Sequence, residues 1–395
     1  MNTKASSKSE RGGRSLLRSI ALVTGALLMT STLAACGSDS NGTSDAPKSE
    51  AASIEAVNKT LDSARGVPSF APPGPAVDAA KAKGKKIFYL AVTMNVPIVQ
   101  TWFGGLKDAA EAVGLEATSF DGKGQPNEFV RGFETAVSQG YDVILVESIA
   151  SDSIAEPIKR ARQAGIKVII CNERTAADGG PVLSDIDGGV SMPYSDAAQL
   201  EADWVISDSK GTGKVAIFRM PNVPAHDGMV DRIKDEFKKH APGLEIVDVQ
   251  EVAIPDWATR LPTLTRTLLT QHPDLDYIIP LVDGMALNIV PALKQANKAN
   301  QVSISTFNAT PAVMKMLRDG SPVKANVGGG NVWESWAYVD QALRLLTGME
   351  PVEQNIPLRM FDTTNITDID VDAQEGTWYD TNAAIDGYKK LWGLA

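Results

Sequence analysis

The sequence is poor in the residues and motifs from which many active sites are built. Its three histidines do not have the spacing of metal ligands. It contains neither a G-x-S-x-G nor an H-E-x-x-H motif, and Gly211–Lys214 lacks the upstream glycine of a phosphate-binding loop. We therefore expect no metal, no cofactor and no enzymatic activity. Acid–base chemistry by paired carboxylates, such as Glu147 and Glu173, is the alternative.

The sequence also lacks an excess of positive charge and a long apolar run at its start. Its formal net charge is −10, whereas a protein that binds nucleic acid needs a basic surface. The apolar run Ile20–Leu33 is shorter than the roughly 20 residues that a membrane-spanning helix needs. A nucleic-acid partner and a membrane-spanning start are therefore not expected.

What the N-terminus does contain is typical of protein export. Five basic residues precede Ile20–Leu33, and small residues follow it. The tetrapeptide Leu33–Cys36 resembles the lipobox of bacterial lipoproteins, which implies cleavage before Cys36 and a lipid on its sulfur. We expect residues 1–35 to be a signal peptide, and the anchor at Cys36 to be the chain's only attachment to the outer face of the cell membrane. Ordinary secretory cleavage is the alternative.

Cysteine is scarce, and only Cys36 and Cys171 are present. With Cys36 assigned to the anchor, Cys171 has no partner for an internal disulfide. It ends the apolar run Lys167–Cys171, so we expect a buried, inert thiol. Removal of residues 1–35 would take away five basic groups and one acid, which changes the net charge from −10 to −14.

Composition divides the remaining chain into a tether and a folded body. Residues 36–84 are expected to form a flexible tether, because Gly37–Glu50 is polar and Val67–Pro75 contains four prolines. A short helix over Ala51–Ala64 would interrupt it. From Lys85 onward about 310 residues remain, which is more than one hydrophobic core usually takes, so two domains are expected.

Strand and helix patterns alternate through this body. Short apolar runs recur about every 25–30 residues, the length of a βαβ unit, with residues at helical spacing between them. Continuous apolar strands between helices are typical of parallel sheets buried on both faces. Two such series predict an α/β protein with two doubly wound parallel-sheet lobes. The expected strands are 87–93, 142–146, 167–171, 214–218, 244–247, 277–279 and 302–304.

Polar and aromatic side chains follow many of these strands. In open parallel sheets ligands bind beyond the carboxyl ends of the strands. Carboxylates and amides bind hydroxyl groups and aromatic rings stack on C–H faces, so the set suits a polyhydroxylated ligand. Each polar residue has the alternative role of a helix cap or turn former. The candidates are Asn95, Trp102, Glu147, Asn172, Glu173, Arg174, Arg219, Asp227, Trp257, Asp283, Asn308, Asn331 and Trp333.

A series of short motifs resembles the ribose-type periplasmic binding proteins in order and spacing. The motifs are Thr93–Pro97, Gln139–Leu145, Ala164–Val168, Gly213–Val215, His272–Asp276, Asp283–Leu287 and Ser303–Asn308. The resemblance covers roughly residues 85–350. It implies the type I fold of that family, with two lobes that are joined by a three-strand hinge and close on a ligand. It further implies a monomeric binding component of an ABC importer, with a sugar-like small molecule and a permease as partners.

The resemblance also implies where the lobes begin and end. The N-terminal lobe would comprise residues 85–183 and 330–360, and the C-terminal lobe residues 184–329 and 361–395. The three crossings between them are expected near Leu183–Asp185, Asn326–Gly330 and Leu358–Thr363.

Several positions depart from the contact pattern of the family. The family's Asp-Arg pair after the fourth strand falls on Asn172–Glu173, or on Glu173–Arg174 if one residue is inserted. Losing one buried polar pair can cost about 1–3 kcal/mol. A modified, larger or less hydroxylated ligand is therefore expected in place of ribose. The apolar residues at contact positions of the family are Val96, Ile98, Val99 and Val282.

Two further functions are associated with such lobes. A transcription regulator would need a basic helix-turn-helix at the N-terminus, where this chain has the export pattern. A ligand-sensing receptor subunit, for a non-sugar or amphipathic molecule, would use the same closed state and is the alternative to transport.

Overall fold

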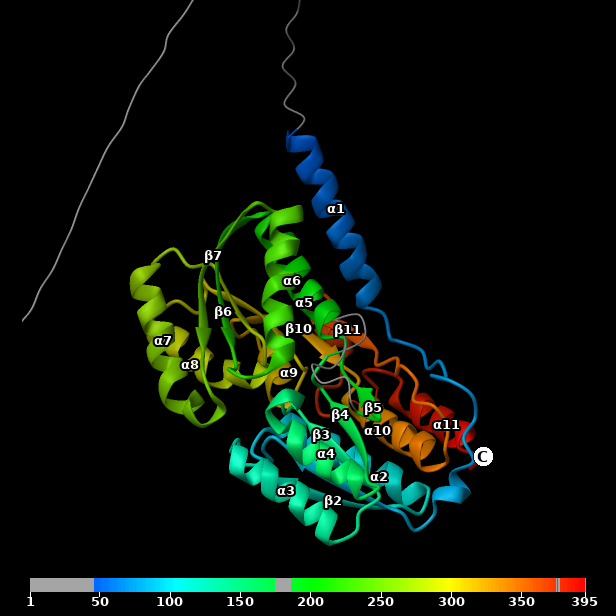
Figure 1. Cartoon of the computed structure of the whole chain (residues 1–395). Helices are drawn as coiled ribbons and strands as arrows, with labels where there is room; N and C mark the ends of the chain where they lie inside the picture. Colours follow the sequence, from blue (N-terminus) through cyan, green and yellow to red (C-terminus); the bar gives the residue numbers. More distant parts are fainter. Residues whose placement is uncertain (1–45, 175–185, 374, 376, 395) are drawn as a thin grey trace, which may run out of the picture. The chain divides into compact units, whose positions relative to one another are not determined.

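Two β-sheets organise the protein, as a computed structural model of residues 46–174, 186–373, 375 and 377–394 shows (Figure 1). Sheet A has the strand order β2-β1-β3-β4-β5, and sheet B has the order β11-β10-β9-β8-β6-β7. The expected fold class, two α/β lobes built on doubly wound sheets, is confirmed. No helix in these ranges is long and apolar enough to cross a membrane.

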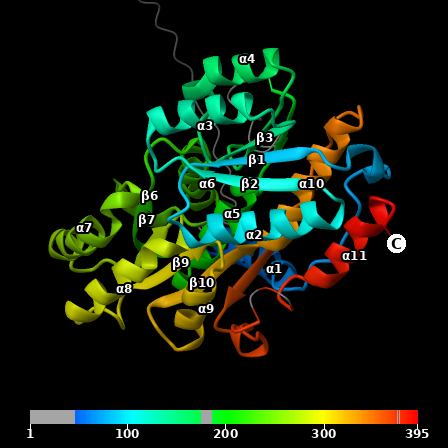
Figure 2. The same cartoon turned by 90° about the horizontal axis from the view of Figure 1, so that it is seen from below.

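Sheet A is entirely parallel, and each of its inner strands is apolar on both faces. Phe88 and Leu90 pack with α3 and α4, whereas Ile87 and Tyr89 pack with α2 and α10 on the opposite face. Figure 2 shows α3 and α4 on one side of the sheet and α2 on the other. The elements are β1 (Lys86–Ala91), β2 (Glu116–Asp121), β3 (Val143–Glu147), β4 (Lys167–Cys171), β5 (Gly188–Val190), α2 (Pro97–Ala112), α3 (Pro126–Ser138), α4 (Ala155–Gln163), α10 (Asn331–Leu346) and α11 (Thr381–Leu391).

Sheet B is parallel except for its edge strand β11, which pairs antiparallel with β10. Helices α5 and α6 cover one face, and α7, α8 and α9 cover the other. The elements are β6 (Thr212–Arg219), β7 (Gly243–Glu251), β8 (Tyr277–Pro280), β9 (Ser303–Phe307), β10 (Val323–Gly329), β11 (Leu358–Asp362), α5 (Tyr194–Ser209), α6 (Pro224–His240), α7 (Trp257–Gln271), α8 (Ala286–Gln295) and α9 (Pro311–Arg318). Short 3₁₀ helices are η1 (Ala79–Ala82), η2 (Ser151–Ile154), η3 (Ile254–Asp256), η4 (Asp283–Met285) and η5 (Ile366–Asp368).

The described chain passes between the sheets after β5, between β10 and α10, and between α10 and β11. The crossings touch one another. A Cβ on Gly329 would lie 2.4 Å from the sulfur of Met192, and the Gly330 N–H donates to the Pro357 carbonyl. The first predicted crossing, near Leu183–Asp185, lies outside the described residues.

The predicted lobe boundaries need two corrections. Residues 188–190 fall within the predicted C-terminal lobe, but they pair with β4 and extend sheet A. Residues 381–391 also fall within that predicted lobe, but α11 packs on α10, which covers sheet A. Both segments have apolar partners on the N-terminal side; Tyr388 and Trp392, for example, pack on Trp336.

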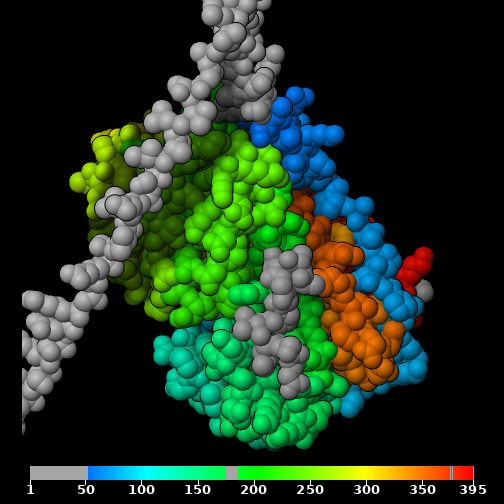
Figure 3. Space-filling view, turned by 45° about the horizontal axis from the view of Figure 1, so that its top comes forward, coloured from blue at the N-terminus to red at the C-terminus, as the bar shows by residue number. Residues whose placement is uncertain are grey.

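The predicted flexible tether also needs correction from residue 46 onward. Helix α1 (Ala46–Ala64) packs on α5, α6 and β11. Val57 and Leu61 are buried in this contact, and Val77 further along is buried as well. The proline-containing stretch 67–75 has neither helix nor strand, as expected. It is nevertheless packed, because its Phe70 contacts Trp333 of α10 and Tyr388 of α11, and it continues from α1 along the body of the protein (Figures 1 and 3).

Candidate functional site

The carboxyl ends of the sheet A strands lie at one level. The strand register aligns Ala91 with both Asp121 and Glu147, and Glu147 with Cys171. Because parallel strands end at the same edge, the residues that follow them share that edge. The structure therefore brings the predicted site residues of the N-terminal lobe, Asn95, Glu147 and Asn172–Arg174, to one end of sheet A.

Glu147 is fully buried at this edge. It accepts hydrogen bonds from Ser148 Oγ at 2.7 Å, Asn172 Nδ2 at 3.1 Å and Tyr338 Oη at 2.9 Å. Burial raises the pKa of Glu147 to about 7, and these three bonds oppose the rise. Burial and the charge of Glu147 also raise the pKa of the nearby Glu334, which lies on α10. The pair forms a buried acidic cluster between sheet A and α10.

A pH-dependent stability follows from Glu147. Its carboxyl holds a proton up to about pH 7 in the folded protein but only to about pH 4.5 in the unfolded chain. The stabilisation is complete below pH 4.5 and is lost as the pH rises through 7. Lowering the pH from 8 to 5 should therefore stabilise the protein by about 2–3 kcal/mol through this group.

The variant Glu147→Gln, which cannot titrate, should remove the share of the pH dependence that comes from Glu147, while the other buried carboxyls, Glu334, Asp283 and Glu375, keep theirs. Urea unfolding at pH 5, 6, 7 and 8 measures it, and Glu111→Gln, at an exposed position, is the matched control. Parallel pH profiles for Glu147→Gln and the unchanged protein would contradict the assignment.

Asn172 joins the end of β4 to two neighbouring elements. Its Nδ2 donates to Glu147 and to Tyr338 Oη, and its Oδ1 accepts the Met192 N–H at 3.0 Å. Its φ of +56° lies in the left-handed region, which asparagine tolerates better than most residues. Met192 in turn contacts Gly329 at the end of β10. The carboxyl ends of both sheets therefore converge on the first crossing.

The other predicted residues on this edge differ in exposure. Glu173 is buried, and its Oε1 accepts from the backbone and hydroxyl of Ser151. Arg174 is half-buried and Asn95 is exposed. The Asn95 N–H bonds to Thr93 Oγ1, which makes it part of the turn after β1.

In sheet B, Asp283 organises the corresponding edge. It is fully buried, and its Oδ2 accepts from the Thr310 N–H at 2.6 Å, from Thr310 Oγ1 at 2.8 Å and from Asn326 Nδ2 at 3.2 Å. Burial raises its pKa to about 6, and the bonds from Thr310 and Asn326 limit the rise. The turn held in this way includes Asn308, whose φ of +120° is outside the range that residues other than glycine usually adopt.

Asn331, the first residue of α10, completes this edge. Its Nδ2 donates to the Asn308 carbonyl and to Glu375 Oε1, and Glu375 Oε2 accepts the Val332 N–H at 3.1 Å. A carboxylate at a helix N-terminus interacts favourably with the helix dipole. Burial nevertheless raises the pKa of Glu375 to about 7.

Four predicted site residues share one property. Each has a buried polar side-chain atom without a hydrogen-bond partner among the described residues: Trp102 Nε1, Asp283 Oδ1, Asn308 Oδ1 and Asn331 Oδ1. Buried polar groups are nearly always paired. The three oxygens belong to the connected edge around Asn308, and α2, which carries Trp102, packs on α10. The four atoms comprise three acceptors and one donor.

The remaining predicted residues are engaged elsewhere. Arg219, at the end of β6, pairs with Asp227 on α6 and with Glu251 at the end of β7. Trp257 donates from Nε1 to the Val252 carbonyl, and a Cβ on Gly284 would lie 3.1 Å from its ring. These contacts hold the predicted residues Arg219, Asp227 and Trp257 within the C-terminal lobe.

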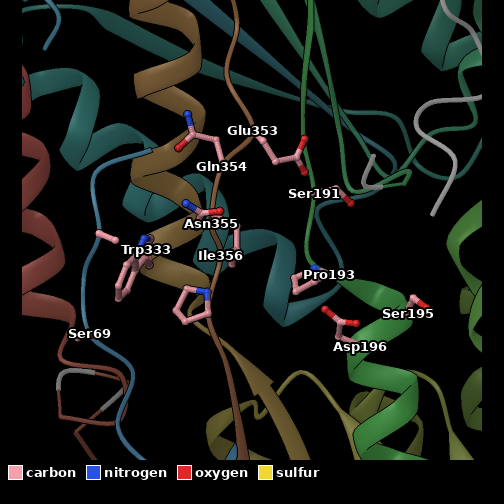
Figure 4. Close-up of a pocket in the computed structure, with 12 residues that line it drawn as sticks. Ser69, Ser191, Pro193, Ser195, Asp196, Trp333, Glu353, Gln354, Asn355 and Ile356 are labelled. Carbon is pink, nitrogen blue, oxygen red and sulfur yellow. The ribbon is translucent and has the colours of Figure 1, made fainter. Parts of the chain in front are cut away.

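Trp333, in the first turn of α10 just after β10, packs on the segment before β1. Its ring packs against Phe70 with centroids 5.3 Å apart. It lines a hollow of about 410 Å³ beside the crossings, together with residues such as Pro193 and Ile356 (Figure 4).

Sequence reasoning missed several residues of these edges: Thr310, Asn326, Glu334, Tyr338 and Glu375. A signal existed for Glu334 and Tyr338, because residues four apart lie on the same helix face. Thr310 follows Asn308 by two residues and could be read as a turn former. No local pattern points to Glu375, because its contact with Asn331 is made only by the tertiary fold.

The fold and these edges define a class: two-lobed α/β proteins whose parallel strands end around a common set of crossings. Residues 75–350 match the periplasmic binding protein domain family, and the chain belongs to this family. The resemblance seen in the sequence is thereby confirmed.

Among curated proteins, the ABC transporter periplasmic-binding protein YphF of Escherichia coli K12 is 24% identical over 269 residues, covering 66% of this chain and 80% of the relative. The ribose import binding protein RbsB of Salmonella typhimurium is 24% identical over 244 residues, covering 61% and 79%.

Solved structures share the fold. The 5-methylthioribose transporter solute binding protein of Thermotoga lettingae superposes with a TM-score of 0.70 at 17% identity, over 80% of this chain and 99% of that one. The Caulobacter myo-inositol binding protein gives 0.65 at 19% identity, over 74% and 96%.

Proposed function

We propose that this protein is an extracytoplasmic solute-binding lipoprotein that captures a sugar or sugar derivative and delivers it to the permease of an ABC transporter. The observation that carries the proposal is the set of four unpaired buried atoms on Trp102, Asp283, Asn308 and Asn331. Hydroxyl groups can donate to the three oxygens and accept from the indole N–H. The names of the relatives add support, since they include a ribose import binding protein and a 5-methylthioribose-binding protein.

The ligand we propose carries an apolar part as well as hydroxyls. Val96, Ile98 and Val99, which occupy family contact positions, are buried and apolar. A site built to pair with a hydroxyl rejects a ligand without it, and an apolar position makes no such demand. The 5-methylthio group on the ligand of the Thermotoga lettingae protein is an example of such chemistry.

The proposed mechanism is closure of the two lobes about the three crossings. Ligand bound to one lobe would gain contacts from the other only in the closed state, and so would shift the population toward closure. The permease would then recognise the closed arrangement. The anchor at Cys36 lies outside the described residues; mass spectrometry of the mature protein tests it, and a lipid-free N-terminus would overturn that part of the proposal.

A thermal-shift screen over pentoses, hexoses, alkylthio sugars and cyclic polyols tests the function. A ligand that binds only the folded protein raises its Tm. We expect at least one such compound to do so, and to be recovered chemically unchanged. Conversion of the compound to a product would favour an enzyme instead.

Trp102→Phe should weaken binding of the compound found in this screen by about 2- to 10-fold, the effect of one hydrogen bond. The variant removes the unpaired N–H and also part of a buried ring, so Tm without ligand should fall as well. Trp336→Phe is the matched control, because Trp336 is equally buried but stacks on Trp392. The fall in Tm should be similar for the control, whereas the loss of affinity should be confined to Trp102→Phe. Unchanged affinity of Trp102→Phe in calorimetry would contradict the placement of the site.

A further inference from the structure

Residues 46–84 are bound to both lobes. We propose that this segment, termed the N-terminal strap, is a fourth connection between the lobes and restricts their relative movement. This inference rests on the lobe closure proposed above. The strap from Ala46 to Gly74 lies before the part of the chain that matches the family, which begins at residue 75.

The first half of the strap is fixed to the C-terminal lobe. Ser53 Oγ bonds to His240 Nδ1 at 2.7 Å, and Ser207 Oγ donates to Asn58 Oδ1 at 2.5 Å. Arg65 pairs with the buried Asp362 of β11 at 2.5 Å. The buried side chains of Val57 and Leu61 add apolar contact to these polar ones. Helix α1 therefore has an extensive, mixed interface with α5, α6 and β11.

The second half of the strap is fixed to the N-terminal lobe. The Phe70 ring lies 5.3 Å from the Trp333 ring and 5.0 Å from the Tyr388 ring, on α10 and α11. The Val77 N–H donates to the Leu391 carbonyl at 2.8 Å. A Cβ on Gly387 would lie 2.3 Å from the Phe70 ring, so this glycine is what allows Phe70 to dock on α11.

Only residues 66–69 separate the two anchored parts. Gly66, Val67 and Ser69 are exposed. A chain extends by at most about 3.6 Å per residue, so Arg65 and Phe70 cannot move more than about 18 Å apart while both stay docked. Proline at position 68 further limits the conformations of this link.

The strap runs from one lobe to the other beside the three crossings. Ser69 and Ala71 line the same hollow as the first crossing, at Ser191 and Pro193, and the third crossing, at Glu353–Pro357. Figure 3 shows the blue segment running beside the orange residues before β11, from the green helices of one lobe toward the other lobe. The N-terminal strap lies alongside the three crossings. As a fourth short connection, it should limit twisting and shear between the lobes.

Spin labels on Glu134→Cys in α3 and Thr267→Cys in α7, both exposed positions, would report the distance between the lobes in ligand-free protein. A protease site inserted between Val67 and Pro68 allows the strap to be cut after folding. The same site between Ala299 and the exposed Asn300, in a turn of one lobe, is the control. We expect cutting the strap to broaden the distance distribution and cutting the control site to leave it unchanged.

Two substitutions test the strap without cutting the chain. Gly387→Ala should displace Phe70 and broaden the distribution, as should Phe70→Ala. The double variant should be no broader than Phe70→Ala alone, because the clash needs the ring. In the Phe70→Ala background, Gly387→Ala should even raise Tm, since alanine favours a helix over glycine.

Distributions of equal width in the intact and strap-cut proteins would overturn the strap proposal. That result is independent of the proposed function, which the ligand screen tests separately. A compound that stabilises the protein while the cut changes nothing would leave the binding function standing and remove the strap from it.

Discussion

Replacing Asp340 by alanine should lower the free energy of unfolding by about 3–5 kcal/mol. Asp340 and Arg344 form an ion pair on α10 in which both side chains are fully buried, with Nε to Oδ2 at 2.7 Å. The alanine variant would leave the guanidinium in the interior without its counter-charge, and such a loss costs more than the intact pair contributes.

Two further contacts make Asp340 a central acceptor. Gln354 Nε2, in the third crossing, donates to it at 2.8 Å, and Trp392 Nε1, after α11, donates at 2.9 Å. The carboxylate therefore ties α10 to a hinge segment and to the end of the described chain. Loss of the carboxylate leaves donors on three buried side chains, Arg344, Gln354 and Trp392, without their acceptor.

Urea unfolding followed by circular dichroism measures this effect. Asp62→Ala is the control, because Asp62 pairs with Arg65 at an exposed position, where such pairs contribute at most about 1 kcal/mol. If Asp340→Ala lowers the free energy of unfolding no more than Asp62→Ala does, the role assigned to Asp340 is wrong.

Asn172→Ala should lower the free energy of unfolding by about 4 kcal/mol. Part of this loss comes from the side chain and part from the backbone. The side chain makes three buried hydrogen bonds, to Glu147, Tyr338 and the Met192 N–H. Leaving buried groups without partners costs about 1–3 kcal/mol each before relaxation. Alanine at a φ of +56° adds about 1 kcal/mol of backbone strain.

Asn297 is the matched control, since it has the same φ of +56° but is exposed. Asn297→Ala should cost only the backbone part, about 1 kcal/mol. Asn172→Gly should recover that part and still lose the hydrogen bonds. Equal losses for Asn172→Ala and Asn297→Ala would show that the buried bonds of Asn172 contribute nothing.

The sheets could be predicted because their signal is local. Apolar runs such as Val143–Val146 are buried on both faces and give β3, one of the inner strands. The strand β5 was missed because its sequence, Gly188–Val190, has no such run. It joins sheet A only through the neighbouring β4 and the elements packed around it.

The candidate site could likewise be predicted only where the signal is local. The rule that ligands bind at strand ends selects Asn308 and Asp283 as candidates without a structure. The rule does not identify side chains that form ion pairs within their own lobe, as Arg219 does with Asp227 and Glu251. Trp333 was selected for its place at a crossing, but its partner Phe70 comes from a segment that composition alone marks as unstructured.

The burial of Cys171, expected from its apolar run, is confirmed, and it has a practical consequence. The side chain is 0% exposed, and burial raises its pKa well above the usual value, so little reactive thiolate forms near neutral pH. Within the described ranges it is the sole native cysteine. Maleimide and nitroxide reagents should therefore attach at engineered cysteines in this part of the chain, with no need to mutate the native one.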